Sequence, residues 1–193
     1  MRETTREEDM AYCLFGIFDV QLAPLYGEGI QKAFGRLQEE IIKTSTDLSF
    51  LAWNLQDRTN WGNAMATSPW RFKDVSRIVS RRIRPIEPFQ ITNIGLRVTL
   101  LLVPQEEDAG REGVIAVLTN CFLDDALSTR IGIRIALYNT NDDFYCREVS
   151  ELCTVTDTMI EQAQEKTIYL ATRDPKELYP PEIFSILATG KES

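Results

Sequence analysis

The chain has 193 residues, of which 44% are hydrophobic, and its 29 acidic and 21 basic residues give a net charge of −8. This composition is typical of a soluble globular protein and excludes fibrous, low-complexity and disulfide-miniprotein classes. The chain has no histidine, which excludes a Ser-His-Asp or Cys-His site, a histidine-ligated metal and an imidazole proton shuttle.

The cysteines and the apolar stretches indicate the setting of the protein. Cys13, Cys121, Cys146 and Cys153 form no C-x-x-C pair, so we expect reduced, mostly buried thiols and no metal site. The apolar stretch at residues 98–103 is far shorter than the roughly 18 to 20 residues that span a bilayer. The N-terminal residues do not resemble a signal peptide. We therefore predict a cytoplasmic protein without a membrane partner.

Charge is unevenly divided along the chain. Residues 1–96 contain 12 basic and 12 acidic residues, whereas residues 97–193 contain 9 and 17. The acidic second half disfavours a phosphate-backbone partner. Residues 70–84 contain six basic and two aromatic residues, but contact with the acidic half explains this cluster without nucleic acid. We do not expect a nucleic-acid partner.

The first fifty residues predict two helices and a short strand. Residues 4–8 form a capping-box pattern, in which Glu8 or its neighbour reaches back to the first turn of a helix over residues 6–18. The apolar face of this helix is expected to contain Met10, Cys13, Leu14 and Ile17. A second helix is predicted by apolar residues spaced three and four apart. These residues are Ile30, Ala33, Phe34, Leu37, Ile41 and Ile42. Residues 48–53 have the length and composition of a strand.

The connection between the two helices contains Gly27-x-Gly29, which superficially resembles the start of a dinucleotide fingerprint. No hydrophobic strand precedes it and the third glycine is missing, so we interpret it as a turn before a helix. The acidic turns at residues 106–108 and 142–143 lack the spacing of a calcium loop. No metal and no cofactor are predicted.

The hydrophobic period changes to two after Pro88. Strands are predicted over residues 95–103, 114–123, 130–138, 144–149 and 166–172. Polar turns separate them without long amphipathic helices, which favours antiparallel pairing. We predict an α+β fold in which an N-terminal helix pair packs on a C-terminal antiparallel β-sandwich or barrel. The expected divisions are a helical segment at 1–53, an irregular connector with one helical turn at 54–88, a β domain at 89–173 and a tail at 174–193.

Residues 2–18, RETTREEDMAYCLFGIF, resemble the last conserved block of the fungal heterokaryon incompatibility (HET) domain. PLYGEG at residues 24–29 and RLQEEII at residues 36–42 are similar to the segment that closes this domain, and SFLAW at residues 49–53 continues it. The remainder is similar to the uncharacterised β-rich domain that commonly follows it. The resemblance implies a role in fungal non-self recognition and programmed cell death.

HET domains are thought to be distant relatives of the TIR fold, so the resemblance also allows NAD cleavage. The earlier HET blocks would precede residue 2, so the helix pair would be the remnant of a TIR-like α/β domain. We therefore expect an interaction or regulatory protein without autonomous catalysis, whose partners are full-length HET-domain proteins or copies of itself. The alternative is an NAD-cleaving TIR-like enzyme of which this chain is a fragment. A carbohydrate-binding module rests on architecture alone.

Four polar residues are the candidate binding residues of this chain. They are Arg6, Asp9, Tyr12 and Glu28. The first three match the family motif, whereas a purely structural interpretation makes Asp9 a first-turn partner of the helix dipole and Tyr12 a half-buried packing residue. Adjacent glutamates on a helix point about 100° apart and cannot act as an acid/base pair. No catalytic residue is predicted.

Overall fold

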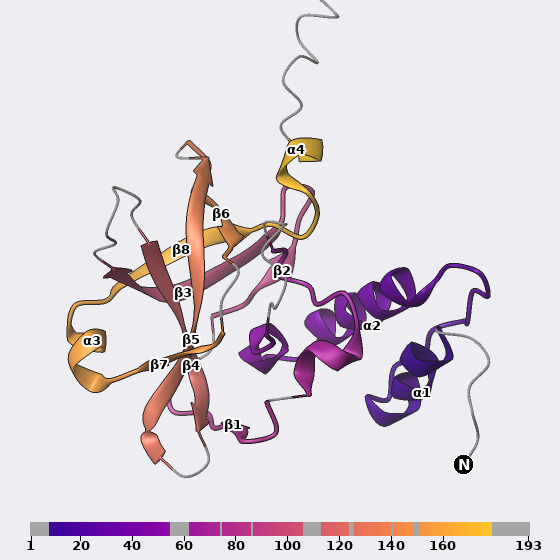
Figure 1. Cartoon of the computed structure of the whole chain (residues 1–193), viewed down its shortest axis with the longest axis horizontal. Coiled ribbons are helices and arrows are strands. Elements are labelled where there is room, and N and C mark those ends of the chain that lie inside the picture. Colours follow the sequence, from indigo (N-terminus) through magenta and orange to yellow (C-terminus); the bar gives the residue numbers. More distant parts are fainter. Residues whose placement is uncertain are drawn as a thin grey trace, which may run out of the picture.

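The structure is a computed structural model in which a barrel of strands and a helical part lie side by side (Figure 1). It describes residues 8–54, 62–73, 75–85, 87–105, 113–123, 126–139, 141–148 and 151–178, and the structural statements below concern these residues. Helices occupy the N-terminal part and strands dominate the C-terminal part. The predicted α+β class is confirmed.

The second helix, α2 (Ile30–Thr44), follows the predicted apolar stripe. Its buried positions are Ala33, Phe34, Leu37, Gln38 and Ile42. The stripe packs against α1 (Asp9–Ile17) and against Trp53, Ala66 and Phe72, which come from later in the chain. The apolar face of α2 is therefore covered by the chain itself.

The buried face of α1 differs from the predicted one. Ala11 and Phe15 are buried, whereas Cys13 is exposed and Ile17 is 74% exposed. Residues 10–17 are apolar on nearly every side, so spacing alone does not select the face that packs. The contact with α2 selects it instead.

The helix α1 begins at Asp9, and Glu8 occupies its N-cap position. Its Oε1 atom accepts a hydrogen bond from the backbone N–H of Gly27, at 3.0 Å. The predicted capping box, in which Glu7 or Glu8 reaches back to an earlier residue, stays a prediction. Residues 4–7 of the predicted pattern lie outside the described residues.

Residues 48–51 form a 3-10 helix, η1 (Leu48–Leu51), and not the predicted strand. Asp47 Oδ1 accepts from the backbone N–H of Ser49 at 2.8 Å and fixes this turn. Leu48, Phe50 and Leu51 are buried in the main core of the barrel. A short apolar run does not distinguish a strand from a buried helical turn, which explains the error.

Two short elements follow. The predicted helical turn is confirmed as the 3-10 helix η2 (Pro69–Phe72). The strand β1 (Ile78–Ser80) was not predicted, because three residues are too few for a period-two signal. It pairs antiparallel with residues 121–123 of the barrel strand β4 (Gly113–Leu123).

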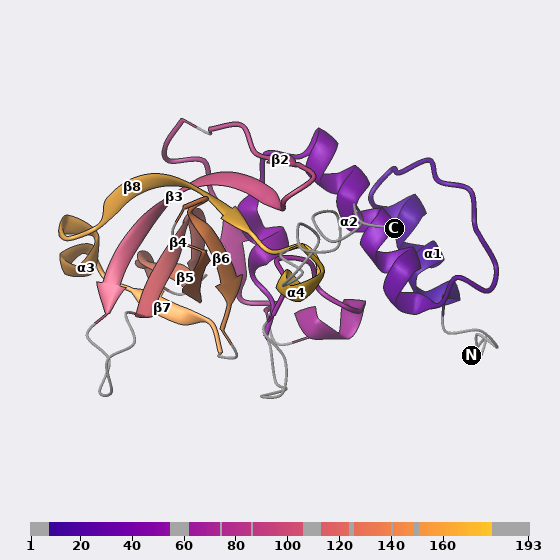
Figure 2. The ribbon, with the colours of Figure 1, turned by 90° about the horizontal axis from the view of Figure 1, so that it is seen from above.

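The barrel is a closed ring of strands, which Figure 2 shows curling round a common interior. Its members are β3 (Leu96–Gln105), β4, β5 (Ala126–Asn139), β6 (Phe144–Arg147) and β8 (Gln164–Leu170). β4 pairs with β3 and β5, β6 with β5 and β8, and β8 with β3, so the ladder returns to its start. The short β2 (Gln90–Ile91) pairs with β3.

One pairing in the ring departs from the predicted antiparallel arrangement. β6 and β8 are parallel, with Phe144 opposite Tyr169 and Tyr145 opposite Leu170. The chain between them contains β7 (Cys153–Val155) and α3 (Asp157–Glu161). A parallel pair needs such a crossover of a dozen or more residues. The segment predicted as a loop therefore returns the chain to the end of the barrel from which β6 starts.

Alternate strand residues fill the barrel interior, as the period of two predicts. They include Leu96, Val98, Leu100 and Leu102 of β3 and Ile131, Ile133 and Ile135 of β5. Outside the ring, residues of α3 pack on Leu101 and Val103, while Leu178 of α4 (Pro175–Leu178) packs with Phe144. Ile42 of α2 belongs to the same cluster as the barrel interior, so the two parts share a core.

Two buried polar side chains join the helical part to the barrel. Arg147 of β6 is 3% exposed, and its guanidinium donates to the carbonyls of Leu51, at 2.9 Å, and Trp53. The guanidinium also lies 3.9 Å from the centre of the Trp53 ring, and burial lowers the pKa of Arg147 to about 9. Gln38 of α2 exchanges two hydrogen bonds with the backbone of Ala66. Arg147 thus holds Leu51 and Trp53, and Gln38 holds Ala66.

Candidate functional site

The connection between α1 and α2 is organised around the hydroxyl of Tyr12. This hydroxyl accepts from the backbone N–H of Leu25 at 3.1 Å. Its proton faces the carbonyl of Leu25, at 2.8 Å, and the carboxylate Oε1 of Glu28, at 2.9 Å. Partial burial, followed by the hydrogen bond to Glu28, raises the pKa of Tyr12 above its ordinary value. The phenol is therefore a structural donor, and its proton is held more firmly than in water.

Glu28 is the centre of the charged part of this arrangement. Its Oε1 atom accepts from Arg36 Nη1 of α2 at 2.7 Å as well as from Tyr12. Arg36 Nη2 donates to the carbonyl of Ala23 at 2.9 Å. Together with Glu8, which accepts from Gly27, these side chains form what we call the Tyr12 network: Glu8, Tyr12, Glu28 and Arg36. Each of these side chains takes part in a hydrogen bond between a helix and the connection that joins α1 to α2.

The backbone of this connection needs its glycines. Gly27 and Gly29 have φ values of 92° and 78°, which favour glycine over residues with a side chain. Gly29 is the N-cap of α2, so the predicted turn before a helix is confirmed. Glu28 lies between the two glycines, and this places its carboxylate against Tyr12 and Arg36.

The structure brings together two of the four candidate binding residues. Tyr12 and Glu28 are hydrogen-bonded, whereas Asp9 lies in the first turn of α1, near the positive end of the helix dipole. Arg6 lies outside the described residues. Glu8 and Arg36 were not predicted as partners of this site. The spacing of eight residues between Glu28 and Arg36 does not predict their ion pair, because a turn between the two residues brings them together.

The network presents two large side chains to solvent. Leu25 is 53% exposed and Tyr26 is 65% exposed, and we call them the 25–26 surface. The backbone of Leu25 is bonded on both its N–H and its carbonyl to Tyr12, and the ring of Tyr26 stands edge-on to that of Tyr12 at 5.8 Å. Exposed apolar side chains on a fixed backbone favour contact with another protein, since little conformational entropy is lost on binding.

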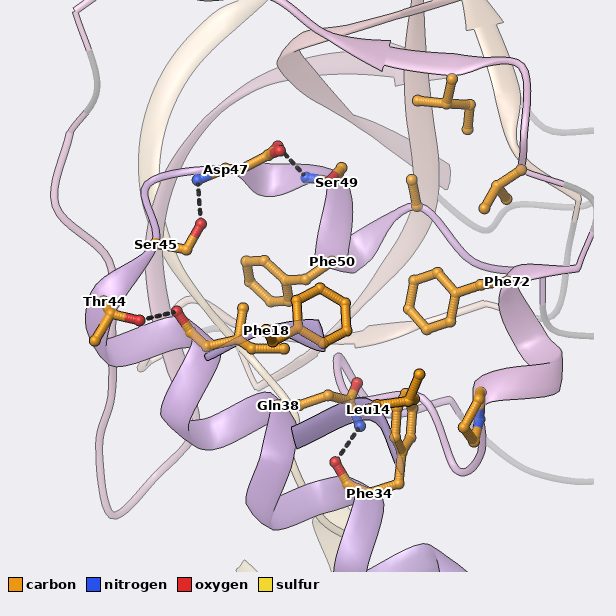
Figure 3. Close-up of a pocket in the computed structure, with 15 residues that line it drawn as sticks. Leu14, Phe18, Phe34, Gln38, Thr44, Ser45, Asp47, Ser49, Phe50 and Phe72 are labelled. Atoms are coloured by element: carbon orange, nitrogen blue, oxygen red, sulfur yellow. Dashed lines mark hydrogen bonds between the residues drawn. The ribbon is translucent and has the colours of Figure 1, made fainter. Parts of the chain in front are cut away.

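A second feature is a pocket between the helical part and the barrel, which we call the interface pocket. It has a volume of about 500 Å³ and is lined by residues of α1, α2, η1, η2 and β1. Figure 3 shows Phe18, Phe34, Phe50 and Phe72 around it, with Thr44, Ser45, Asp47 and Ser49 grouped on one side. Asp47 is the one charged side chain among the described residues that line it. The pocket is suited to an apolar ligand with a polar end.

Metal ligands and thiols are the other candidates for chemistry in the part of the chain that is described. No group of three or more cysteine, aspartate or glutamate side chains there could hold a metal ion. Cys121 and Cys146 are free and buried, and burial raises the pKa of each thiol to about 12. These two thiols are poor nucleophiles at neutral pH.

None of the helices in the described ranges has the length and apolar character needed to cross a membrane.

Comparison with known proteins identifies one related stretch. Over 42 residues, 22% of this chain, the sequence is 69% identical to the vegetative incompatibility protein HET-E-1 of Podospora anserina. The match covers 3% of the length of that protein. No protein-family model and no solved structure matches the chain. A short region is therefore related to a heterokaryon incompatibility protein, while the assignment to the HET domain itself stays a prediction.

Proposed function

We propose that this chain is an interaction module of heterokaryon incompatibility and performs no catalysis of its own. The 42-residue identity with an incompatibility protein carries the proposal. An identity of 69% is a close relation for so short a stretch, but it concerns a small part of that protein, so the role of the whole protein comes to this chain only as a proposal. The proposed partner is an incompatibility protein that contains the related stretch.

The 25–26 surface is the proposed contact with this partner. Several polar side chains and two glycines hold the connection in one conformation, although Leu25 and Tyr26 themselves are mostly exposed. Fixing a backbone costs roughly 1 to 2 kcal/mol per residue, and burial of these two side chains does not offset that cost. Because the backbone of a preorganised surface is already ordered in the free chain, this entropy cost is not incurred again on binding, and the affinity for the partner is higher.

The proposed role of the Tyr12 network is positioning. The carboxylate of Glu28 is engaged by Tyr12 and Arg36, and the hydroxyl of Tyr12 is engaged by Glu28 and the backbone of Leu25. Groups held in this way support a loop and are not arranged to exchange a proton with a substrate. This arrangement favours the interaction module over the alternative of an NAD-cleaving enzyme.

Binding of the full chain to the Podospora protein tests the proposal. The purified chain is immobilised, and the association of HET-E-1 is followed at increasing concentration. We expect saturable binding that the double substitution Leu25→Ser/Tyr26→Ser weakens at least tenfold. The matched control is Ile83→Ser, because Ile83 is 50% exposed and lies far along the chain from the connection. Absence of saturable binding, or equal loss in the control, would overturn the proposal.

Catalysis is tested separately. The chain is incubated with NAD and the release of nicotinamide is measured over time. We expect none above the rate of a heat-denatured sample. Turnover that scales with the concentration of folded chain would reject the non-catalytic role and establish the enzyme alternative.

A further inference from the structure

Aromatic pairs form part of the wall of the interface pocket. Phe34 stands edge-on to Phe72, with ring centres 6.3 Å apart. Phe50 packs against Phe89, a residue outside the pocket, at 5.4 Å. Such pairs favour a defined orientation of the rings. The pocket is present in the structure without a ligand, which is the usual condition of a small-molecule site.

Its size and lining specify the apolar part of a ligand. A volume of about 500 Å³ lies within the range of roughly 300 to 1,000 Å³ that small-molecule sites occupy. The walls come from Leu14, Phe34, Ile41, Phe50 and Phe72, which belong to four different elements. Water in such a space has few hydrogen-bond partners, so a hydrocarbon chain displaces it favourably.

The polar side of the pocket specifies the other end of the ligand. Ser45 Oγ accepts from the backbone N–H of Asp47 at 3.1 Å, and Asp47 Oδ1 accepts from that of Ser49 at 2.8 Å. The second carboxylate oxygen of Asp47 has no hydrogen-bond partner among the described residues. Thr44 donates its hydroxyl to backbone carbonyls of α2, which leaves that oxygen as a further acceptor. One negative charge among hydroxyl groups favours a cationic head group that donates hydrogen bonds.

We propose that the interface pocket binds a single-chain amphiphile of the long-chain amine class. Its hydrocarbon chain lies among the phenylalanine rings and its ammonium group meets Asp47 and the neighbouring hydroxyls. A fatty-acid carboxylate of the same length is disfavoured by the like charge of Asp47. This site is independent of the 25–26 surface and of the proposed partner protein.

Calorimetric titration of the full chain with octyl-, decyl- and dodecylammonium, below their micelle concentrations, tests the proposal. We expect one site per chain and an affinity that rises about fourfold for each added methylene, as burial of one CH₂ group predicts. Decanoate, titrated in the same buffer, is expected to bind at least tenfold more weakly than decylammonium.

Substitutions separate the pocket from general attraction of a cation to an acidic protein. Asp47→Asn keeps the oxygen that caps η1 and is expected to remove the preference of decylammonium over decanoate. The matched control is Glu151→Gln, an exposed residue outside the pocket, which leaves the preference intact. Leu14→Trp fills the apolar end and is expected to abolish binding of both amphiphiles. If this variant does not fold, the proposal is still tested by the titrations of the unmodified protein with the three ammonium probes and decanoate.

Three results would overturn the proposal. The first is the absence of saturable binding by any of the ammonium probes. The second is equal binding of decylammonium and decanoate, which would show that Asp47 does not select the head group. The third is an equal response of Asp47→Asn and Glu151→Gln, which would assign the binding to the net charge of the chain.

Discussion

The barrel and the helical part are stabilised in different ways. The barrel closes its own hydrogen-bond ladder and fills its interior with alternate residues of its strands. In contrast, α1 packs mainly on α2, and the connection between them depends on the polar Tyr12 network. The barrel is therefore the structural base, while the helical part presents a surface whose shape depends on a few polar bonds.

The largest expected effect is at the joint between the two parts. Arg147→Ala removes the donors to the carbonyls of Leu51 and Trp53 and leaves a cavity beside the Trp53 ring. We expect a loss of about 3 kcal/mol or more in the free energy of unfolding. Arg147→Met, which fills the space and removes a buried charge, is expected to lose less.

Chemical denaturation of these variants measures the difference. Arg97→Ala, at an exposed position of β3, is the control and is expected to stay within about 0.5 kcal/mol of the unmodified protein. Equal stability of Arg147→Ala and Arg97→Ala would show that the buried guanidinium does not join the two parts.

A matched pair of glycine substitutions contrasts the packing of the two parts. A Cβ atom at Gly132 of β5 would lie 2.4 Å from Ile115 Cγ2 and 3.0 Å from Val155 Cγ2. At Gly35 of α2 it would meet nothing within 4 Å. We expect Gly132→Ala to lower the free energy of unfolding by about 2 kcal/mol and Gly35→Ala to raise it by about 0.5 to 1 kcal/mol. Thermal melts of both variants check the signs, and the same sign for both would contradict this contrast.

The buried thiols of the barrel predict a loss of stability at alkaline pH. The pKa of Cys121 and Cys146 is about 12 in the folded chain, above the ordinary value of 9.0. Between pH 9 and pH 12 the thiols ionise in the unfolded chain and stay protonated in the folded one, so stability falls. Each contributes a loss of about 1 kcal/mol per pH unit in this window.

The lowered pKa of Arg147 acts in the opposite direction over the same window, because its folded form loses a proton first. The thiol effect is therefore measured as a difference from the variant Cys121→Ala/Cys146→Ala. Denaturation of both proteins at pH 8, 9, 10 and 11 is expected to show that the advantage of the unmodified protein shrinks as the pH rises. A constant difference would mean that the two thiols ionise equally in both states.

The smallest expected loss of stability is at the Tyr12 network. Tyr12→Phe removes the hydroxyl that bonds Leu25 and Glu28 and is expected to cost about 1 kcal/mol of stability. The effect on the connection is expected to be larger than the effect on the whole fold. Hydrogen exchange of residues 23–28 is expected to accelerate in this variant while the barrel strands are unchanged. Unchanged exchange at residues 23–28 would show that the network does not fix this segment.

Regular patterns were predicted well from the sequence, and contacts between distant elements were not. The stripe of α2 and the alternation in β3 and β5 follow from local periods, which the packed structure preserves. Other features depend on which distant part of the chain packs opposite, and local spacing does not determine that. They are the buried face of α1, the turn at residues 48–51 and the parallel pairing of β6 and β8.

The candidate site shows the same limit. Tyr12 and Glu28 were predicted as polar residues of interest, but their hydrogen bond and their shared contact with the connection follow from the turn at the two glycines. Glu8 and Arg36 contact Gly27 and Glu28, respectively, because this turn brings the connection against both helices. The interface pocket was not predicted, because its walls come from five separate elements.

Hydrogen–deuterium exchange of the full chain, with and without HET-E-1, tests whether the helical part presents the 25–26 surface to an incompatibility protein while the barrel serves as its base. We expect slower exchange in α1 and in residues 19–29 when the partner is bound, with the strands β3 to β8 unchanged. Protection confined to the barrel, with residues 19–29 exchanging as in the free chain, would contradict it.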